Sequence, residues 1–206
     1  YTSINSPSTD SIRLYECNIT LNTEDTIRDN IEQILSTMGI ADLIWSPSGK
    51  YKLVLDYPTS ASATDTLIDS NHYFTEDDII RETATIDWPS AQDRFTQVTV
   101  QFDNEAENFK PDSVTWPPTE AAANSVYQTY LSEDNNNPLT TSVSPSGITT
   151  KYHALAYAEQ QVRKSRLIYT LDVTLSKKAL TVEPGDLIKI TSDNLGLDNG
   201  YVFRVE

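Results

Sequence analysis

Carboxylates are the reactive side chains that this sequence offers in quantity. The 206-residue chain holds 30 Asp and Glu residues, and Glu76, Asp77 and Asp78 stand next to one another. Two carboxyl groups hydrolyse a glycosidic bond only when they are held at a defined separation, which a sequence does not reveal. In a chain this acidic, a run of acids is usually a solvated face. We therefore expect no catalytic pair here.

Oxygen ligands and glycines gather in the loop 192–200, which reads Ser-Asp-Asn-Leu-Gly-Leu-Asp-Asn-Gly. This composition suits calcium, but the spacing is not that of an EF-hand, whose loop ends in a bidentate Glu. Backbone conformation alone explains Asn, Asp and Gly in a turn between strands. Two histidines and one cysteine are too few for a zinc site or an internal disulfide. The sequence therefore predicts no metal-binding residue and no cofactor.

Nucleophiles and bases offer no better candidate, because no catalytic motif of known mechanism is present. His153 opens a predicted helix and His72 lies in a polar stretch, and nothing marks either as a ligand or a base. Cys17 is expected to pack as a small hydrophobe. Three basic residues cluster at the end of the predicted helix that starts near His153: Arg163, Lys164 and Arg166. They can meet an acidic neighbour, but we favour salt bridges within the fold and interaction with the helix dipole.

The overall charge excludes several classes of partner. Fifteen Lys and Arg against 30 Asp and Glu give a net charge of −15, and the pI is about 4.4. Binding nucleic acid requires basic residues gathered on one face, so we expect no sequence-specific nucleic-acid partner. An anionic membrane would repel the chain. No apolar run approaches the roughly 20 residues of a membrane-spanning helix, so we expect no direct membrane insertion.

The first predicted element is a helix over residues 23–38. Asn22 or Thr23 can cap its start and Gly39 can end it. Five apolar residues fall on one stripe at helical spacing: Ile27, Ile31, Ile34, Leu35 and Met38.

A hairpin follows the helix, with strands at 43–45 and 51–55 around the turn Ser46-Pro-Ser-Gly49. Tyr51, Leu53 and Leu55 alternate, so they share one face of the second strand. We expect the helical stripe to be buried on this hairpin.

The middle of the chain contains one clear strand, over residues 95–102, in which Val98, Val100 and Phe102 alternate with polar residues. Residues 103–150 are the least regular part, rich in Pro, Ser, Thr and Asn. A functional excursion and a surface loop both fit such a stretch. Within it, Trp116 could stack on a sugar.

The last third is regular again. Thr149 or Thr150 can cap a helix that runs to about residue 163. Strands are predicted at 167–175, 186–190 and 201–205, with a turn at Pro184-Gly185. A meander of short strands separated by turn residues is typical of a barrel or a sandwich.

Four motifs resemble one known family. They are Trp45-Ser-Pro-Ser-Gly-Lys-Tyr-Lys-Leu53, the strand from Arg94 to Asp103, the helical segment from Gly147 to Arg166, and Leu180-Thr-Val-Glu-Pro-Gly-Asp-Leu-Ile-Lys-Ile190. Their order over residues 25–206 is similar to that of the phage tail-tip hub proteins, the lambda-type host-specificity (J-like) proteins of siphophages. In the second motif, Thr96 or Gln97 replaces the Asn that is common in the family.

The resemblance implies a structural protein rather than an enzyme. It implies a homotrimeric baseplate hub at the tail tip of the virion, assembled in the cytoplasm of the bacterial host. Such a hub joins the tail tube to receptor-binding parts and forms part of the DNA ejection channel. The implied partners are the distal tail protein, the tape-measure protein, tail fibres and a host surface receptor. No catalytic residue is carried over.

The predicted fold class is α+β, in two domains. Residues 1–90 are expected to form a small helix-plus-hairpin module, of which part of 1–20 pairs with the second domain. Residues 91–206 are expected to form a β-rich, barrel-like hub domain with one helix. Because the sequence lacks an initiator Met and ends within a predicted strand, we expect it to be a piece of a longer protein, truncated at the C-terminus.

Two other functions remain open at the level of sequence. One is a carbohydrate- or receptor-binding module of a phage or bacterial surface protein, favoured by the aromatic residues and by the stretch 103–150. The other is a glycosidase or peptidase domain.

Overall fold

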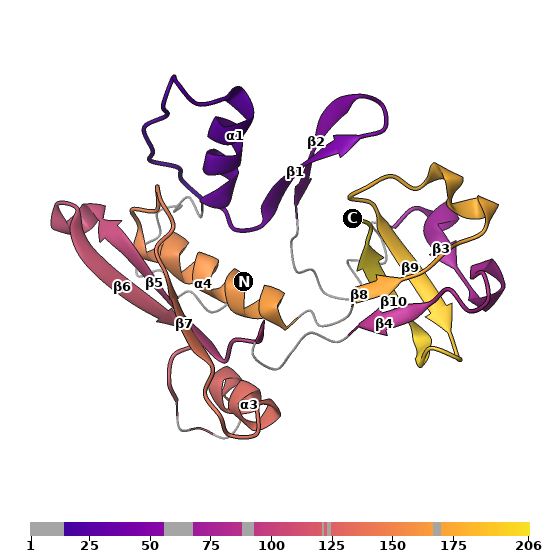
Figure 1. Cartoon of the computed structure of the whole chain (residues 1–206). Helices are drawn as coiled ribbons and strands as arrows, with labels where there is room; N and C mark the ends of the chain where they lie inside the picture. Colours follow the sequence, from indigo (N-terminus) through magenta and orange to yellow (C-terminus); the bar gives the residue numbers. More distant parts are fainter. Residues whose placement is uncertain (1–14, 56–67, 88–92, 121, 123–124, 167–169) are drawn as a thin grey trace. The chain divides into compact units, whose positions relative to one another are not determined.

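The computed structural model describes the chain outside residues 1–14, 56–67, 88–92, 121, 123–124 and 167–169 (Figure 1). The Ser-, Thr- and Asn-rich start at 1–10, which the sequence predicts as a flexible entry, lies outside the described residues. So does most of the Ser-, Thr-, Asp- and Ala-rich stretch 58–72, which the sequence predicts as a surface loop. Two compact units are present: unit 1 comprises Tyr1–Ala41 and Ser90–Leu167, and unit 2 comprises Asp42–Pro89 and Ile168–Glu206. The chain passes from one unit to the other near the predicted boundary at 90/91. It also passes at 41/42 and 167/168, where no sequence pattern indicates a boundary.

Unit 1 is built around a three-stranded sheet in the order β6-β5-β7. The central strand β5 (Gln97–Asn104) pairs antiparallel with β6 (Lys110–Trp116) and parallel with β7 (Thr140–Val143). Val98, Val100 and Phe102 are buried and alternate with more exposed residues. The strand predicted at 95–102 is therefore confirmed, together with the face that it buries.

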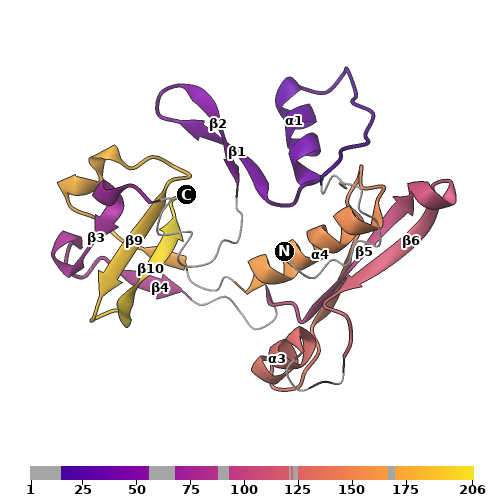
Figure 2. The ribbon, with the colours of Figure 1, turned by 180° about the vertical axis from the view of Figure 1, so that it is seen from behind.

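Helix α4 (Lys151–Ser165) lies across this sheet (Figure 2). Thr150 caps it by accepting a hydrogen bond from the His153 backbone N–H, as predicted. Small residues face the sheet, so the helix can approach it closely. The resulting core combines residues of the helix with residues of the strands: Val98, Val100, Phe102, Val114, Ile148, Ala154, Ala158 and Val162.

The stretch 103–150 is more regular than predicted. Besides β6 and β7 it holds the short helix η4 (Glu105–Glu107) and the helix α3 (Val126–Glu133). Pro111 lies within β6, which is an edge strand and therefore one of the places in a sheet where proline is tolerated. The expectation of an irregular stretch was therefore wrong at 105–107, 110–116, 126–133 and 140–143.

Helix α1 (Ile27–Ser36) exists, but its surroundings differ from the prediction. Thr26 caps it by accepting from the Asp29 N–H, whereas Asn22 accepts from Glu24 in the preceding turn. No residue of α1 is buried, and 81% of Ile27 is exposed. The predicted burial of its stripe is therefore wrong, since Ile31 on the same stripe is also exposed.

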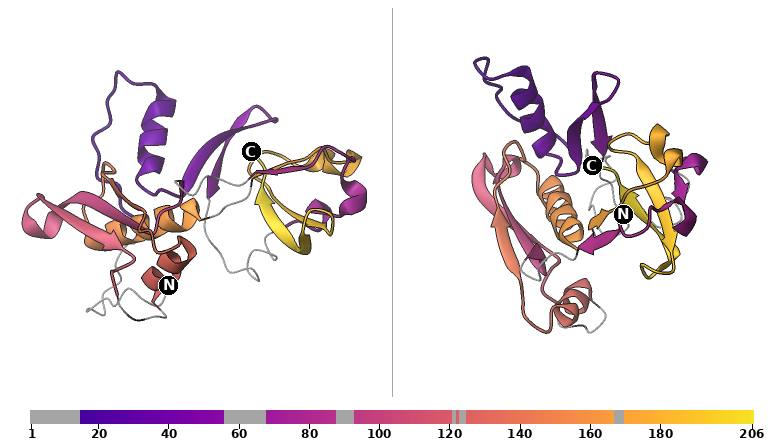
Figure 3. Two further views of the ribbon diagram at one scale, coloured as in Figure 1. Left: turned by 60° about the horizontal axis from the view of Figure 1, so that its bottom comes forward. Right: turned by 45° about the vertical axis from the view of Figure 1, so that its right-hand side comes forward.

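Unit 2 contains the predicted hairpin, β1 (Ala41–Ser46) with β2 (Lys50–Leu55). A second sheet has the order β10-β9-β3, and a third pairs β4 with β8. The yellow strands β9 and β10 are seen from two further sides in Figure 3. The bounds of the remaining elements are β3 (Tyr73–Phe74), β4 (Thr85–Asp87), β8 (Thr170–Asp172), β9 (Leu187–Ser192), β10 (Leu197–Arg204), η1 (Ser70–His72), η2 (Glu76–Asp78) and η5 (Lys177–Thr181).

The core of unit 2 joins two stretches of chain that are about 115 residues apart. Its buried members are Phe74, Ile188, Ile190 and Leu197. Phe74 comes from β3, which pairs parallel with β9. The mixed α+β class is thus confirmed, while the strands of the described residues form small sheets and no closed barrel.

Candidate functional site

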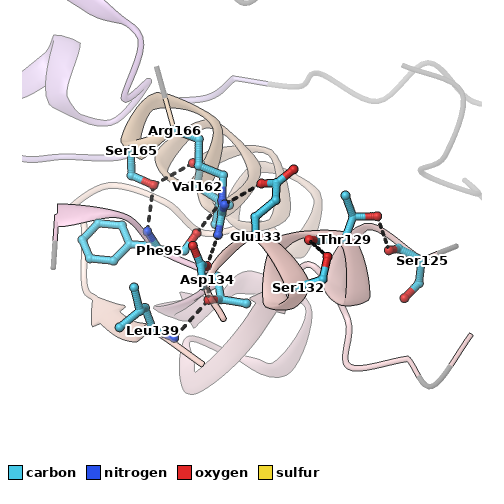
Figure 4. A network of polar contacts seen from close by, with 11 residues as sticks. Phe95, Ser125, Thr129, Ser132, Glu133, Asp134, Leu139, Val162, Ser165 and Arg166 are labelled. Atoms are coloured by element: carbon cyan, nitrogen blue, oxygen red, sulfur yellow. Dashed lines mark hydrogen bonds and ion pairs between the residues drawn. The ribbon is translucent and has the colours of Figure 1, made fainter. Parts of the chain in front are cut away.

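The basic cluster at the end of α4 closes a buried polar network (Figure 4). The Arg166 guanidinium binds the Asp134 carboxylate through Nη2 and Glu133 Oε2 through Nη1, the latter at 2.9 Å. Its Nε donates to the Phe95 carbonyl at 3.0 Å. The exposed fraction is 9% for the Arg166 side chain and 3% for that of Asp134. This ion pair is therefore almost fully withdrawn from water.

Asp134 also anchors the end of α3 to the sheet. The Thr96 hydroxyl donates to Asp134 Oδ2 at 2.7 Å and accepts from the Leu139 N–H at 3.0 Å. Arg166 lies over the Tyr130 ring, with 4.0 Å between the guanidinium carbon and the ring centroid. The network thus fixes the connection between α3 and β7 on β5 and α4. Arg166 therefore stabilises the fold through salt bridges, which is the role that we favoured from the sequence, and it does not present an open basic patch.

Trp116 is half-buried against the same core. The Arg163 guanidinium lies 5.6 Å from its ring centroid, and Arg163 also pairs with Glu159 at 2.7 Å. The Tyr130 ring approaches Trp116 at 6.4 Å between centroids. A ring packed in this way presents little surface on which a sugar can stack.

Two of the sequence candidates come together in unit 2. The Glu76 carboxylate accepts hydrogen bonds from the Ser192 hydroxyl and, at 2.7 Å, from Asn194 Nδ2. The bond from Ser192 is the main reason why the pKa of Glu76 lies below its usual value. The acidic run therefore caps the turn that begins the loop 192–200. No group of three or more His, Cys, Asp or Glu able to hold a metal occurs among the described residues.

Asp78 has a similar structural role beside it. Its Oδ2 accepts from the Thr75 N–H at 3.1 Å and lies 3.3 Å from Lys178 Nζ. The Thr75 backbone bond is the main cause that lowers the pKa of Asp78. The Ser176 hydroxyl donates to Oδ1 at 3.3 Å. Glu76 and Asp78 thus tie η2 to the C-terminal part of the chain, and the acidic run is more than a solvated face.

The remaining sequence candidates lie apart from one another. His72 ends η1 in unit 2, while His153 is buried at the start of α4 in unit 1. Cys17 is exposed, so the prediction that it packs as a small hydrophobe is wrong. The next residue, Asn18, donates hydrogen bonds to Gly147 and Thr149, while the Cys17 thiol stays on the surface.

Sequence reasoning missed one surface, the exposed face of the hairpin. It consists of four large side chains with exposed fractions between 49% and 58%: Trp45, Tyr51, Leu53 and Leu55. The Trp45 and Tyr51 rings meet edge to face at 4.9 Å. The opposite face packs inward, where Val54 is buried. Alternation had grouped Tyr51, Leu53 and Leu55 correctly but could not tell which face of the hairpin is inside. We call the four residues the hairpin face.

No helix of the described residues is both long and apolar enough to cross a membrane. A family model described as putative phage tail protein matches residues 26–206. The chain belongs to this phage tail protein family. The match covers every described element of both units, from α1 to β10.

One curated relative of this phage tail protein is the baseplate hub protein pb3 of Escherichia phage T5. The two are 24% identical over 197 residues, which is 95% of this chain and 18% of the relative. The chain therefore spans less than a fifth of the length of that hub protein. The phage tail class expected from the four motifs is confirmed, whereas the lambda-type assignment stays a prediction.

Proposed function

We propose that this chain is a structural part of a baseplate hub at the tip of a phage tail. One observation carries the proposal: 95% of the chain aligns with a protein named as the baseplate hub protein of phage T5. The alignment runs through both compact units, so the proposal concerns the whole chain and not a single module.

The role that we propose is mechanical and not enzymatic. The charged residues that the sequence singled out act within the fold: Arg166 pairs with Asp134, and Glu76 caps a turn. The hairpin face supports an assembly role, because exposed apolar patches commonly mark surfaces that bind another protein.

The finer assignment follows the lambda-type resemblance. By this resemblance, the hub is a homotrimer that joins the tail tube to receptor-binding parts. Its partners are the distal tail protein, the tape-measure protein and tail fibres, with a host surface receptor beyond them. The protein would be assembled in the host cytoplasm and reside in the virion.

We also propose that the chain forms part of the DNA ejection channel, a role that its acidic charge supports. Lys and Arg along a channel would bind passing phosphates, whereas Asp and Glu would not hold them. The net charge of −15 supports this proposal. Replacing channel-facing Asp or Glu with Lys in the assembled tail should slow DNA ejection. Unchanged ejection kinetics would count against the channel role.

The location is testable by labelling whole virions. The turn at Gly49 is a suitable place for a peptide tag, because it is exposed and a Cβ built there meets nothing within 4 Å. Phages that carry the tag are incubated with gold-labelled antibody and imaged by electron microscopy. We expect gold at the end of the tail distal to the head. Gold along the tail shaft or at the head would overturn the proposal, and so would intact virions that carry no gold. Untagged virions give the background.

A further inference from the structure

The turn that joins β5 to β6 (Figure 1) consists of residues 105–109. Within it, Phe109 has a φ of +57° and directly follows Asn108, whose φ is also +57°. This left-handed backbone costs free energy in L-residues, and a bulky side chain in it is an outlier. We propose that Phe109 is an anchor that inserts into an apolar pocket with a basic rim on another protein of the phage tail. The place of that partner rests on the proposed function.

The backbone of the turn does not explain a phenylalanine at this position. The chain has six glycines, and each of them has a positive φ. The other described residues with a positive φ are Asn108, Asn135 and Asn136, together with Glu82 and Phe109. Asn visits this conformation because its short side chain bonds locally, and Glu82 is exposed to water. Phe109 is therefore the one apolar side chain among these described residues.

Packing within the fold does not explain Phe109 either. The same pair of strands contributes Phe102 to the core of unit 1, where 5% of it is exposed. The exposed fraction of Phe109 is 59%. A single exposed aromatic residue is ordinary, but this one also strains the backbone. Strained residues cluster at sites that bind or react, so the combination indicates binding.

Hydrogen bonds hold the turn in its strained form. The Phe109 N–H donates to the Asn104 carbonyl at 2.8 Å, and the Ala106 N–H donates to Asn104 Oδ1 at 3.1 Å. The Glu105 N–H donates to the Thr149 carbonyl at 3.0 Å, which ties the turn to the start of α4. The position of the Phe109 side chain is thus set before a partner arrives, which lowers the entropy cost of binding.

The charges around Phe109 define the partner. Asp103, Glu105 and Glu107 are exposed, and Lys110 is the exposed base next to Phe109. Aromatic anchors fill apolar pockets, and charges at the rim of an interface are complementary. The pocket is therefore apolar and bordered by Lys or Arg. A second copy of this chain, with its net charge of −15, and an anionic membrane would both repel the turn.

Photo-cross-linking in whole virions tests the anchor. The photoreactive analogue p-benzoylphenylalanine replaces Phe109 in the phage, and purified virions are irradiated. We expect mass spectrometry to find a cross-link from position 109 to a different virion protein, in an apolar peptide with Lys or Arg beside it. Leu180 is the matched control, because it is apolar and 84% exposed but has no positive φ. The analogue at position 180 should cross-link in a much lower yield.

Four results would overturn the anchor. They are virions that contain the chain but give no cross-link from position 109, equal yields from positions 109 and 180, a cross-link only within the chain or to a second copy, and a cross-link only to lipid when vesicles of phosphatidylethanolamine and phosphatidylglycerol are added. An immunoblot shows whether the chain is in the virion at all. Its absence there would overturn the proposed function, and the anchor with it.

A stability measurement separates an anchor from a residue that the fold needs. Asn suits a left-handed backbone, so Phe109→Asn should keep or raise the urea midpoint of the whole chain. Phe102→Ala is the reference and should lower the midpoint, because it leaves a cavity in the core. A midpoint that falls as far in Phe109→Asn as in Phe102→Ala would show that Phe109 stabilises the fold, and would overturn the proposal.

Discussion

At the scale of single residues, the Arg166–Asp134 pair carries the largest electrostatic consequence. Both side chains are almost fully buried, and the carboxylate has a further hydrogen bond from the Thr96 hydroxyl. Removing one partner of such a pair leaves an uncompensated charge in a site with little water. Exposed pairs such as Arg28–Glu32 lack this penalty, because solvent screens both charges.

Arg166→Met should therefore lower the free energy of unfolding by about 3–5 kcal/mol, as measured by urea denaturation. Arg28→Met is the matched control and should cost at most about 0.5 kcal/mol. The double variant Arg166→Met/Asp134→Leu should recover part of the loss, because no unpaired buried carboxylate remains at position 134. Equal costs for Arg166→Met and Arg28→Met would show that the network contributes nothing to stability.

Gly185 is a second residue at which geometry is decisive. It has a φ of +84°, and a Cβ built there would lie 2.5 Å from Val54 Cγ2 and 2.6 Å from Ile44 Cδ1. Gly49 has a similar φ of +75°, but a Cβ there meets nothing within 4 Å. The two glycines therefore share the backbone penalty and differ in steric contact.

Gly185→Ala should be less stable than Gly49→Ala by about 1–3 kcal/mol, the usual cost of overpacking. Thermal unfolding followed by circular dichroism measures both variants. The shared cost of a left-handed backbone cancels in the difference. If the two variants lose the same stability, the hairpin does not pack on the Gly185 turn as described.

At the scale of elements, the hairpin shows where sequence patterns stop being informative. The alternation of Tyr51, Leu53 and Leu55 correctly predicted a strand with these three side chains on one face. That face is exposed, and the buried residue of β2 is Val54. The inner side packs on the Gly185 turn, which lies 131 residues after Val54 along the chain. Large apolar residues on the outer face contradict the rule that such residues mark the inside.

Substitutions on the two faces of β2 should show which face of the strand is buried. Val54→Ala should cost about 2 kcal/mol, because a buried side chain is removed and a cavity remains. Leu53→Ala, on the exposed face, should cost at most about 0.5 kcal/mol in urea denaturation. The reverse order would place the hairpin face in the interior.

At the scale of the whole molecule, each compact unit is made of two separate stretches of chain. Unit 2 needs residues 42–89 as well as 168–206, and its core joins Phe74 to Ile188 and Ile190. In unit 1, Thr37 and the segment around Asn18 bond to residues of the 147–153 region. A cut at the boundary predicted from sequence would therefore divide the core of unit 2, and it would separate α1 and the segment around Asn18 from the rest of unit 1.

The fragment 1–90 should accordingly remain unfolded by itself. Its amide signals in a two-dimensional ¹H–¹⁵N NMR spectrum should show the narrow dispersion of an unfolded chain, because neither of its stretches holds a complete core. The intact chain provides the folded reference spectrum. A well-dispersed spectrum of the fragment would instead support the independent module that the sequence suggested.

The sequence by itself determined the local structure and the class of the molecule. Periodicity and capping residues located α1, α4, β5 and the hairpin, since these signals act over a few residues. The order of four motifs indicated a phage tail protein. Only the tertiary structure decided which faces are inside, how the chain divides into units, and what the charged residues bind. These outcomes depend on partners distant in the chain, such as Gly185 for Val54 and Asp134 for Arg166, and no local pattern encodes such pairings.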